Sequence, residues 1–431
     1  MAAVQHVLLS TEAELLVKAL DVSSLEKVGD KRWWNRHDML EKLNIQSIMN
    51  IPSNSCFITE NLLTHGKISL VINELITSEI WSERIFPILY HEMSQKDQST
   101  LPVYMTLFHE ATVAGLVESV FYYKEVSEEA GDFLLDLIDY AYRKLTKLIS
   151  KQHCESITQK DPKNDLLKQN EDIQFTIAMK CISIIKYICD AMDSITLSAI
   201  TRILNTHDFP YLLSQLIDLA PWKKRKENGE VEIFTDNKWV IVPKDETHLL
   251  PKIEGQVWLT LYQLLLHPEA QRKYEYNLHR KTQLLKLRRY LHELLLDQLP
   301  YLSEVQRFLE NLSVMDPPPS KQDLIIEQIP EVRNKLERMY EGRWNKIAKT
   351  QLQQNFTMSS KDMKEHAQRL AATYDLDILE SLIDEAPTCS NCQNEATKRC
   401  SRCQNEWYCS RPCQVKHWSK HKELCNILSA K

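Results

Sequence analysis

Cysteine and histidine residues that could bind metal gather at the C-terminal end of this 431-residue chain. Seven of its 11 cysteines lie between residues 389 and 425 and, with one histidine, follow the spacing C-x2-C-x7-C-x2-C-x5-C-x3-C-x7-H-x3-C. A Cys-x2-Cys turn supplies two ligands to one zinc ion, and residues four apart in a helix share a face. The eight ligands could therefore complete two tetrahedral sites, although the spacing alone leaves their pairing open. They are Cys389, Cys392, Cys400, Cys403, Cys409, Cys413, His421 and Cys425.

The chemistry expected of such sites is structural. A catalytic zinc site keeps one position open for water, whereas eight protein ligands close both sites. His417 lies four residues from Cys413 and from His421, so it shares their face of the expected helix. Because seven cysteines and His421 already fill both tetrahedra, we expect His417 to lie on the helix surface or beside a ligand.

The charge of this segment favours a protein ligand over a nucleic acid. Residues 389–431 contain eight Lys and Arg against three Asp and Glu. The side chains of this segment therefore carry +5, and those of the rest of the chain carry −11, because the total is −6. Seven bound thiolates and two Zn²⁺ ions would bring the segment to about +2. A weakly positive segment on an acidic chain does not resemble a surface that follows phosphates.

The remaining composition indicates a helical, intracellular protein. No apolar run reaches the length of about 18 residues that a membrane span needs, and the N-terminus lacks the charged and apolar regions of a signal peptide. Clustered cysteines in such a chain indicate metal binding rather than disulfides, and we expect the scattered cysteines to be buried apolar residues. These are Cys56, Cys154, Cys181 and Cys189.

Amphipathic helical periodicity dominates residues 10–385. Degenerate similarity among these segments suggests stacked helical repeats of the armadillo or HEAT kind, and an irregular all-helical domain is the alternative. Two more helices are expected beyond Pro317–Pro319. The predicted helices before that point are 66–80, 105–123, 129–150, 173–192, 194–204, 210–219, 256–266, 281–298 and 302–313.

One segment of the body predicts β-structure instead. Residues 231–242, VEIFTDNKWVIV, alternate apolar and polar side chains around Asp236 and Asn237, which predicts a β-hairpin. It is expected to be an insertion that caps the helical array, and a protruding partner contact is the alternative. We expect the preceding basic run, 223–226, to be a solvated loop, and residues 155–171 to form a long loop between helices.

These patterns divide the chain into a helical body at 1–383, a joint at 384–387, a metal-binding unit at 389–425 and a tail at 426–431. No catalytic constellation is apparent, and we expect no enzymatic activity. The body's Asp and Glu residues are expected to form solvated helix faces. Its histidines lie on different segments with no motif that links them to a nucleophile; they include His37, His65, His91, His109 and His207.

The spacing of the metal-binding unit resembles the MYND zinc finger family. The segment WYCSRPCQVKHWSKHKELC is close to the C-terminal half of that family's pattern, and the x5 gap before Cys409 is one residue longer than its commonest spacing. The resemblance implies interleaved sites: Cys389, Cys392, Cys409 and Cys413 would bind one zinc ion, and Cys400, Cys403, His421 and Cys425 the other. It also implies a shallow groove for short proline-containing peptides beside Gln414 and Trp418, which match the family's C-Q-x-x-x-W pattern. The alternative for Trp418 is packing against the finger's own core.

The body resembles that of MYND-type zinc finger proteins of the dynein-arm assembly factor kind. The resemblance spans nearly the whole chain and includes ELLVKAL, HDMLEKLNIQSI, LLTHGK, LDLIDYAYRKLT, GQVWLTLYQLLLHPEAQ, LLDQLP and IEQIPE. It implies a cytoplasmic scaffold or co-chaperone, placed near centriolar satellites and the centrosome or in the apical region of ciliated cells. The implied partners are axonemal dynein chains, heat-shock chaperones and co-chaperones, and an assembly factor with leucine-rich repeats.

Three other protein classes share features with this sequence. A SET–MYND methyltransferase would need a β-rich catalytic domain. This body is expected to be helical and is poor in glycine, since the whole chain contains only seven glycines. A RING ubiquitin ligase would need a Cys-x-His-x2-Cys centre, which the sequence lacks. A nuclear corepressor adaptor remains as the alternative, because other MYND fingers serve that role.

Overall fold

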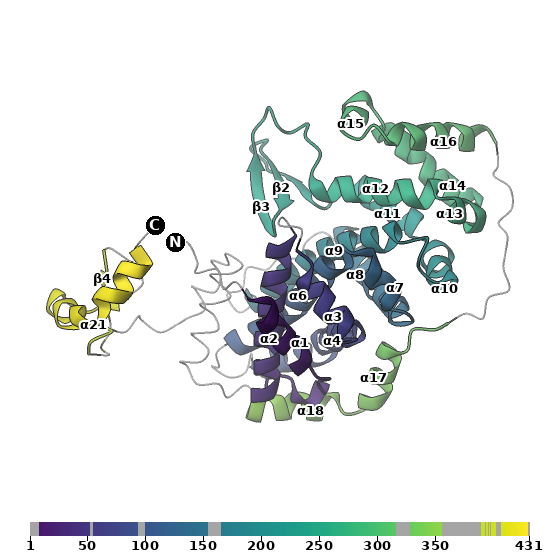
Figure 1. The fold of residues 1–431 in the computed structure, drawn as a ribbon. Coiled ribbons are helices and arrows are strands. Elements are labelled where there is room, and N and C mark those ends of the chain that lie inside the picture. Colours follow the sequence, from purple (N-terminus) through teal and green to yellow (C-terminus); the bar gives the residue numbers. More distant parts are fainter. Residues whose placement is uncertain are drawn as a thin grey trace. The chain divides into compact units, whose positions relative to one another are not determined.

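The computed structural model describes residues 8–51, 55–93, 100–153, 165–315, 328–355, 389–392, 394, 396, 398–401 and 407–429 (Figure 1). Within these ranges, the side chains of 151–153, 165, 355, 419, 420 and 423–429 lie outside the description. The chain forms two compact units, residues 1–359 and 360–431. The predicted joint at 384–387 lies outside the described residues.

The first part of the body is helical. Its elements are α1 (Ser10–Ala19), η1 (Leu25–Lys27), α2 (Lys31–Asn50), α3 (Phe57–Thr64), α4 (Ile68–Ile80), η2 (Trp81–Ile85), α5 (Phe86–Met93), α6 (Leu101–Phe121), α7 (Lys124–Glu129), α8 (Phe133–His153), α9 (Asp165–Asp190), α10 (Leu197–Thr201) and η4 (Arg202–Thr206).

Helix α6 is the centre of this part. It is apolar on nearly all sides, and every side chain except that of Glu118 is buried, as expected for a helix enclosed by others. Helices α2, α4 and α9 pack around it. At Gly115 a Cβ atom would lie 2.7 Å from the Asn44 Oδ1 atom, so the glycine lets α2 approach closely.

The second part of the body combines helices with a small sheet (Figure 1). Strands β1, β2 and β3 form an antiparallel sheet in that order. The elements are α11 (Phe209–Leu219), β1 (Lys223–Arg225), β2 (Val231–Thr235), β3 (Lys238–Val242), α12 (Lys252–Leu266), α13 (Pro268–Lys273), α14 (Leu278–Leu285), η5 (Lys286–Tyr290), α15 (Glu293–Gln298) and α16 (Leu302–Val314).

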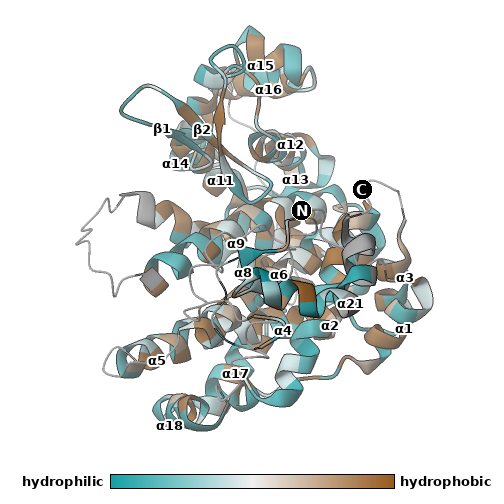
Figure 2. Ribbon diagram, turned by 90° about the vertical axis from the view of Figure 1, so that its left-hand side faces the viewer, coloured by the Kyte–Doolittle hydropathy of each residue, from teal (hydrophilic) through white to brown (hydrophobic). Residues whose placement is uncertain are grey.

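The body ends with a segment that returns to the N-terminal helices. It contains α17 (Val332–Tyr340), α18 (Trp344–Thr350) and η6 (Gln351–Asn355). The helix labelled α17 is largely hydrophilic in Figure 2. Buried Gln351 fastens the segment, since the Trp81 indole donates to Gln351 Oε1 at 2.9 Å and Gln351 Nε2 donates to the Leu25 carbonyl at 2.8 Å.

The predicted hairpin is present as β2 and β3, joined at Asp236 and Asn237, whose φ angles are 48° and 63°. Three other expectations were wrong. The basic run at 223–226 begins with β1, which pairs with β2. Residues 165–171 belong to α9, and the rest of the predicted 155–171 loop lies outside the described residues. The predicted helix 281–298 is divided among α14, η5 and α15.

The coarse prediction of a mainly helical body is confirmed, and the type of repeat stays a prediction. None of the helices within the described ranges has both the length and the apolar content needed to cross a bilayer. Cys181 and Cys189 are buried as expected, Cys56 is half-buried, and Cys154 lies outside the description.

Candidate metal centre

Four cysteines of the C-terminal unit lie together. Cys389 and Cys392 come from one turn, Cys409 follows strand β5 (Trp407–Tyr408), and Cys413 lies in the first turn of α21 (Arg411–Ser429). Strand β4 (Lys398–Arg399) pairs with β5. The backbone N–H and the hydroxyl of Ser390 both donate to the Trp407 carbonyl at 3.0 Å, which ties the first turn to β5.

The spacing of the four sulfur atoms fits a zinc ion. All four Sγ atoms lie within 4.8 Å of one another. The distances are 3.5 Å from Cys392 to Cys409, 3.6 Å from Cys409 to Cys413, and 3.8 Å from Cys413 to Cys392. Zn–S bonds of about 2.3 Å in a tetrahedron place ligand sulfurs about 3.8 Å apart. The structure thus brings together the four residues assigned to the first site, and their chemistry indicates a structural zinc ion.

The surroundings of these thiols favour some thiolates and oppose others. Burial disfavours the charged form of Cys389, but hydrogen bonds from the backbone of Cys409, Asn391 and Cys392 lower its pKa to about 6. The neighbouring Cys392 thiol raises the pKa of Cys409 to about 12. Adjacent thiolates repel one another, and a divalent cation bound among them would stabilise all four.

The second predicted site is described only in part. Cys400 and His421 are each 1% exposed, which suits ligands of an enclosed metal ion. Cys403 and the side chain of Cys425 lie outside the described residues. This second set of ligands therefore stays a prediction.

His417 lies beside the predicted ligands. Its Nδ1 atom is 3.1 Å from the Tyr408 hydroxyl oxygen, and its ring is stacked against that of His421 at a centroid distance of 6.1 Å. These contacts fit the expectation that His417 supports its neighbours while His421 binds metal.

A hollow of about 410 Å³ adjoins α21. Val415 is 67% exposed, and Gln414 and Trp418 are half-buried. Trp418 also packs against the buried cluster of the unit, so it serves both the finger's core and the wall of the hollow. The lining residues are Cys400, Ser401, Arg411, Gln414, Val415 and Trp418. An amide, an aromatic ring and exposed apolar surface suit a short extended peptide.

The body contains buried ionic groups that its sequence did not reveal. Carboxylates expected on solvated faces are instead enclosed between helices: Glu74, Glu79 and Glu110 are 3%, 0% and 1% exposed. Glu110 Oε1 lies 2.5 Å from Lys144 Nζ and accepts the Tyr140 hydroxyl at 2.9 Å. The expectation of solvated carboxylates was therefore wrong at these positions.

Two histidines from different helices also meet inside the body. The Nδ1 atoms of His37 and His109 are 2.7 Å apart, and His109 Nε2 lies 2.9 Å from Glu74 Oε1. Burial opposes the charge of Glu74, but its bonds to His109 and Arg36 lower the pKa of its carboxyl. His37 and Glu74 belong to α2 and α4, so this cluster links both helices to α6.

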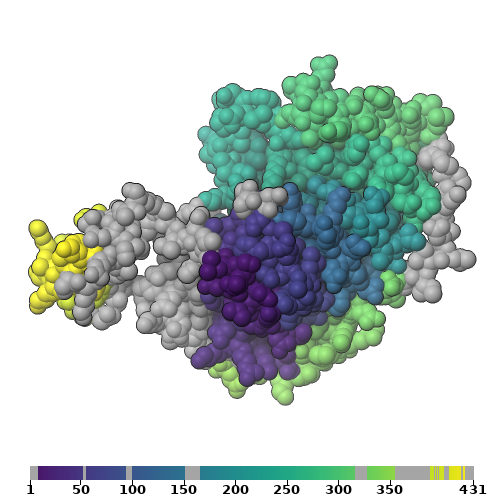
Figure 3. Space-filling model, viewed as in Figure 1, coloured from purple at the N-terminus to yellow at the C-terminus, as the bar shows by residue number. Residues whose placement is uncertain are grey.

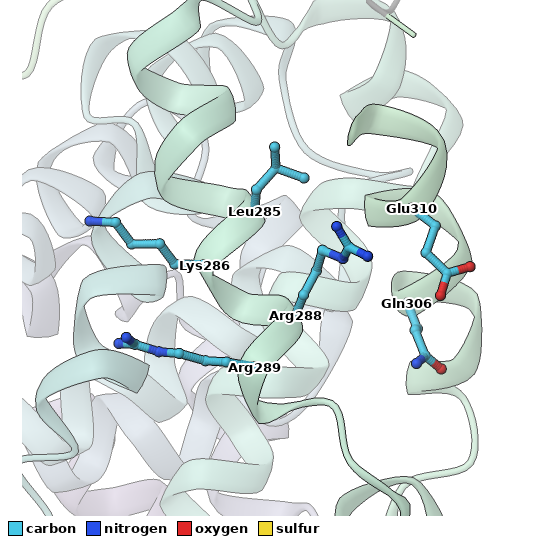
Figure 4. A pocket seen from close by; sticks show the side chains of 6 residues that line it. All are labelled: Leu285, Lys286, Arg288, Arg289, Gln306 and Glu310. Atoms are coloured by element: carbon cyan, nitrogen blue, oxygen red, sulfur yellow. The ribbon is translucent and has the colours of Figure 1, made fainter. Parts of the chain in front are cut away.

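A second hollow, of about 450 Å³, lies on the body between α14–η5 and α16 (Figure 4). Arg288 points toward Glu310 across it, whereas Lys286 and Arg289 point away (Figure 4). Arg289 donates to Asp218 Oδ1 at 2.8 Å. Since both signs of charge line this hollow, we assign it no ligand.

Comparisons with known proteins agree with this geometry. The MYND finger family matches residues 389–425. The whole chain is similar to the zinc finger MYND domain-containing protein 10 homolog of Drosophila melanogaster, with 31% identity over 444 residues that cover 96% of this chain and 98% of the relative. No solved structure matches.

Proposed function

Because the chain belongs to the family of zinc finger MYND domain-containing protein 10, we propose that it is a cytoplasmic scaffold or co-chaperone for the preassembly of axonemal dynein arms. In this role the helical body binds dynein chains and chaperones, and the finger binds a partner assembly factor with leucine-rich repeats. We place it near centriolar satellites in ciliated cells. The role requires no catalysis.

The hollow beside α21, which Gln414 and Trp418 line, is the observation that supports partner binding by the finger. Trp418 offers an aromatic surface on which a proline-containing segment can pack, and Gln414 can hydrogen-bond to an extended backbone. The hollow lies on a unit whose fold zinc would fix, so the surface is preorganised and loses little entropy on binding. We further propose that the second zinc ion is bound by Cys400, Cys403, His421 and Cys425.

The body supplies the larger surface. We propose that its successive helices stack in an armadillo-like manner, so that clients bind along the array rather than in one pocket. This division gives the finger and the body separate partners.

Affinity purification from ciliating cells tests the proposal. Gln414→Ala and Trp418→Ala should each lose the assembly factor, whereas dynein chains and chaperones remain bound and the zinc content is unchanged. Lys416→Ala is the matched control, because Lys416 lies on α21 but does not line the hollow. Gln414→Ala is the more informative of the two variants. Trp418 also packs against the finger's buried cluster, so Trp418→Ala could affect the fold as well as binding.

Two results would contradict the proposal. If both variants still bound the assembly factor, the hollow would not be the site that binds this partner. Recovery of corepressor complexes from nuclear extracts in place of dynein chains would favour a nuclear adaptor.

A further inference from the structure

Strand β3 is an edge of the three-stranded sheet on the body (Figure 1). Among the described residues, no other strand pairs with its outer side. The teal atoms of this segment lie at the surface in Figure 3. An unpaired edge can accept a further strand from another chain.

The register shows which backbone groups face outward. The Phe234 N–H donates to the Trp222 carbonyl at 2.9 Å, away from β3. Phe234 lies opposite Trp239, so this pair does not exchange ladder hydrogen bonds, and bonded pairs alternate with non-bonded ones. The N–H and C=O groups of Trp239 and of Ile241 therefore point to the open side. Pro243, which would come next, has no N–H and ends the donor row.

The side chains of β3 make this edge apolar. Val240 and Ile241 are 44% and 50% exposed. Trp239 is half-buried, and its ring lies 5.4 Å from those of Phe175 and Phe234. The ring contacts with Phe175 and Phe234 therefore hold Trp239 in place, whereas Val240 and Ile241 remain exposed to solvent. This arrangement suits the addition of an extended segment.

A lysine side chain from β1, that of Lys224, lies against the ring of Trp239 on the edge strand. The Lys224 ammonium lies 3.8 Å from the centroid of the Trp239 ring. Its neighbours Lys223 and Lys226 pair with Glu254 and Glu232. No carboxylate in the described part of the chain forms an ion pair with Lys224. The nearby Asp172 carboxyl on α9 feels this charge: burial raises its pKa, and Lys168 and Lys224 partly offset the rise. An acidic residue of an incoming strand, placed beside Trp239, would give Lys224 a direct ion pair.

We propose that β3 is a docking edge that pairs with a short extended segment of a partner protein, one with branched apolar side chains and at least one acidic residue. Backbone bonds to Trp239 and Ile241 supply the pairing, Val240 and Ile241 pack against the apolar side chains, and Lys224 selects the acid. This edge belongs to the body and does not depend on the finger or on the dynein-arm role.

The test uses the full chain and a fluorescein-labelled peptide with three branched apolar residues between two glutamates. Fluorescence anisotropy, with peptide up to about 1 mM, measures binding, and hydrogen exchange read by mass spectrometry locates it. We expect saturable binding with new protection at the amides of Trp239 and Ile241, whose N–H groups point outward. A peptide N-methylated on the bonding edge keeps its side chains but loses its donors, and it should not bind.

Two protein variants address the backbone and the charge separately. Ile241→Pro removes an outward donor without touching the β2–β3 ladder and should weaken binding about tenfold or more. Ile241→Val is its matched control and should bind as the native chain does. Lys224→Glu should weaken binding of the glutamate peptide and strengthen that of its lysine counterpart.

Each other outcome would overturn the inference. Absence of saturable binding, binding that survives N-methylation, or protection located away from β3 would each exclude strand addition there. Light scattering measures the molar mass of the chain in solution. If the native chain were a dimer and Ile241→Pro a monomer, a second copy of the chain, not a partner segment, would occupy the edge.

Discussion

The helical body and the C-terminal finger both bury ionisable groups, but they stabilise them differently. In the body, Glu110 meets Lys144, and other carboxylates meet arginines from distant helices. In the finger, the described buried cluster is Cys389, Ala396, Cys400 and Tyr408, and two of these are predicted ligands. A unit with so small a core needs a metal ion to fold, whereas the body folds by burial around α6.

This difference determines what each region tolerates. Paired charges inside the body hold particular helices together, because removing one partner leaves the other charge buried. The four clustered thiols of the finger contact one another, so they repel one another once they ionise, and a bound cation makes all four thiolates favourable. We therefore expect metal removal to act on the finger alone and loss of a carboxylate to act on the body alone.

The largest effect is expected from Cys389→Ser. This change removes a ligand from the four-cysteine site, and we expect loss of at least one zinc equivalent and unfolding of residues 389–429. Limited proteolysis should then release the finger while the thermal unfolding of the body is unchanged. If the variant kept both zinc equivalents, Cys389 would not be a ligand.

Glu110→Ala should be the most damaging change tested in the body. It leaves the Lys144 ammonium buried without its carboxylate and removes the acceptor of the Tyr140 hydroxyl, at a cost of about 3–5 kcal/mol. Urea unfolding followed by circular dichroism measures the cost. Glu14→Ala, at the exposed pair with Lys18, is the control and should change little. Equal effects would show that burial of the pair is unimportant.

Asp136 should make the body less stable as the pH rises. Burial raises the pKa of its carboxyl to about 6, although the backbone N–H groups of Val332 and Glu331 partly offset this. The folded state therefore holds the proton more tightly than the unfolded chain. The stabilisation is fully present below about pH 3.8 and is lost as the pH rises through about 6.

Asp136→Asn imitates the protonated acid and tests this sign. We expect it to be more stable than the native chain at pH 7, by about 1–2 kcal/mol after solvent screening, with the difference shrinking toward pH 4. Urea unfolding across this range measures it, with exposed Asp132→Asn as control. A difference that did not vary with pH would contradict the assignment.

The smallest effect is expected from His417→Ala. It removes one hydrogen bond to Tyr408, worth about 1 kcal/mol, and should leave zinc content unchanged. His421→Ala, in contrast, should lose a zinc equivalent. Inductively coupled plasma mass spectrometry compares the two variants, and equal zinc loss would make His417 a ligand.

Local patterns were the most predictable from sequence. The Cys-x2-Cys spacing predicted metal ligands because a metal site restricts residue types over short distances, and Cys389 and Cys392 lie in the four-cysteine cluster. The hairpin was predicted correctly because Asp236 and Asn237 tolerate positive φ angles in a tight turn. Strand β1 was missed because a run of lysine and arginine shows no apolar alternation.

Long-range polar pairs could not be found in this way. His37 and His109 are separated by 72 positions, and Arg333 reaches Glu79 from a segment at the far end of the body. Each of these residues alone is typical of a solvated helix face, so only tertiary packing reveals its burial. The hydrophobic periodicity that located the helices contains no information about which polar residues meet.

Native mass spectrometry of the full chain, before and after chelation, tests most directly whether metal maintains the finger. We expect two bound zinc ions at the start. After their removal, hydrogen exchange should show loss of protection at residues 389–429 with the body unchanged. Fewer than two zinc ions, or a finger that stays protected without them, would contradict this conclusion.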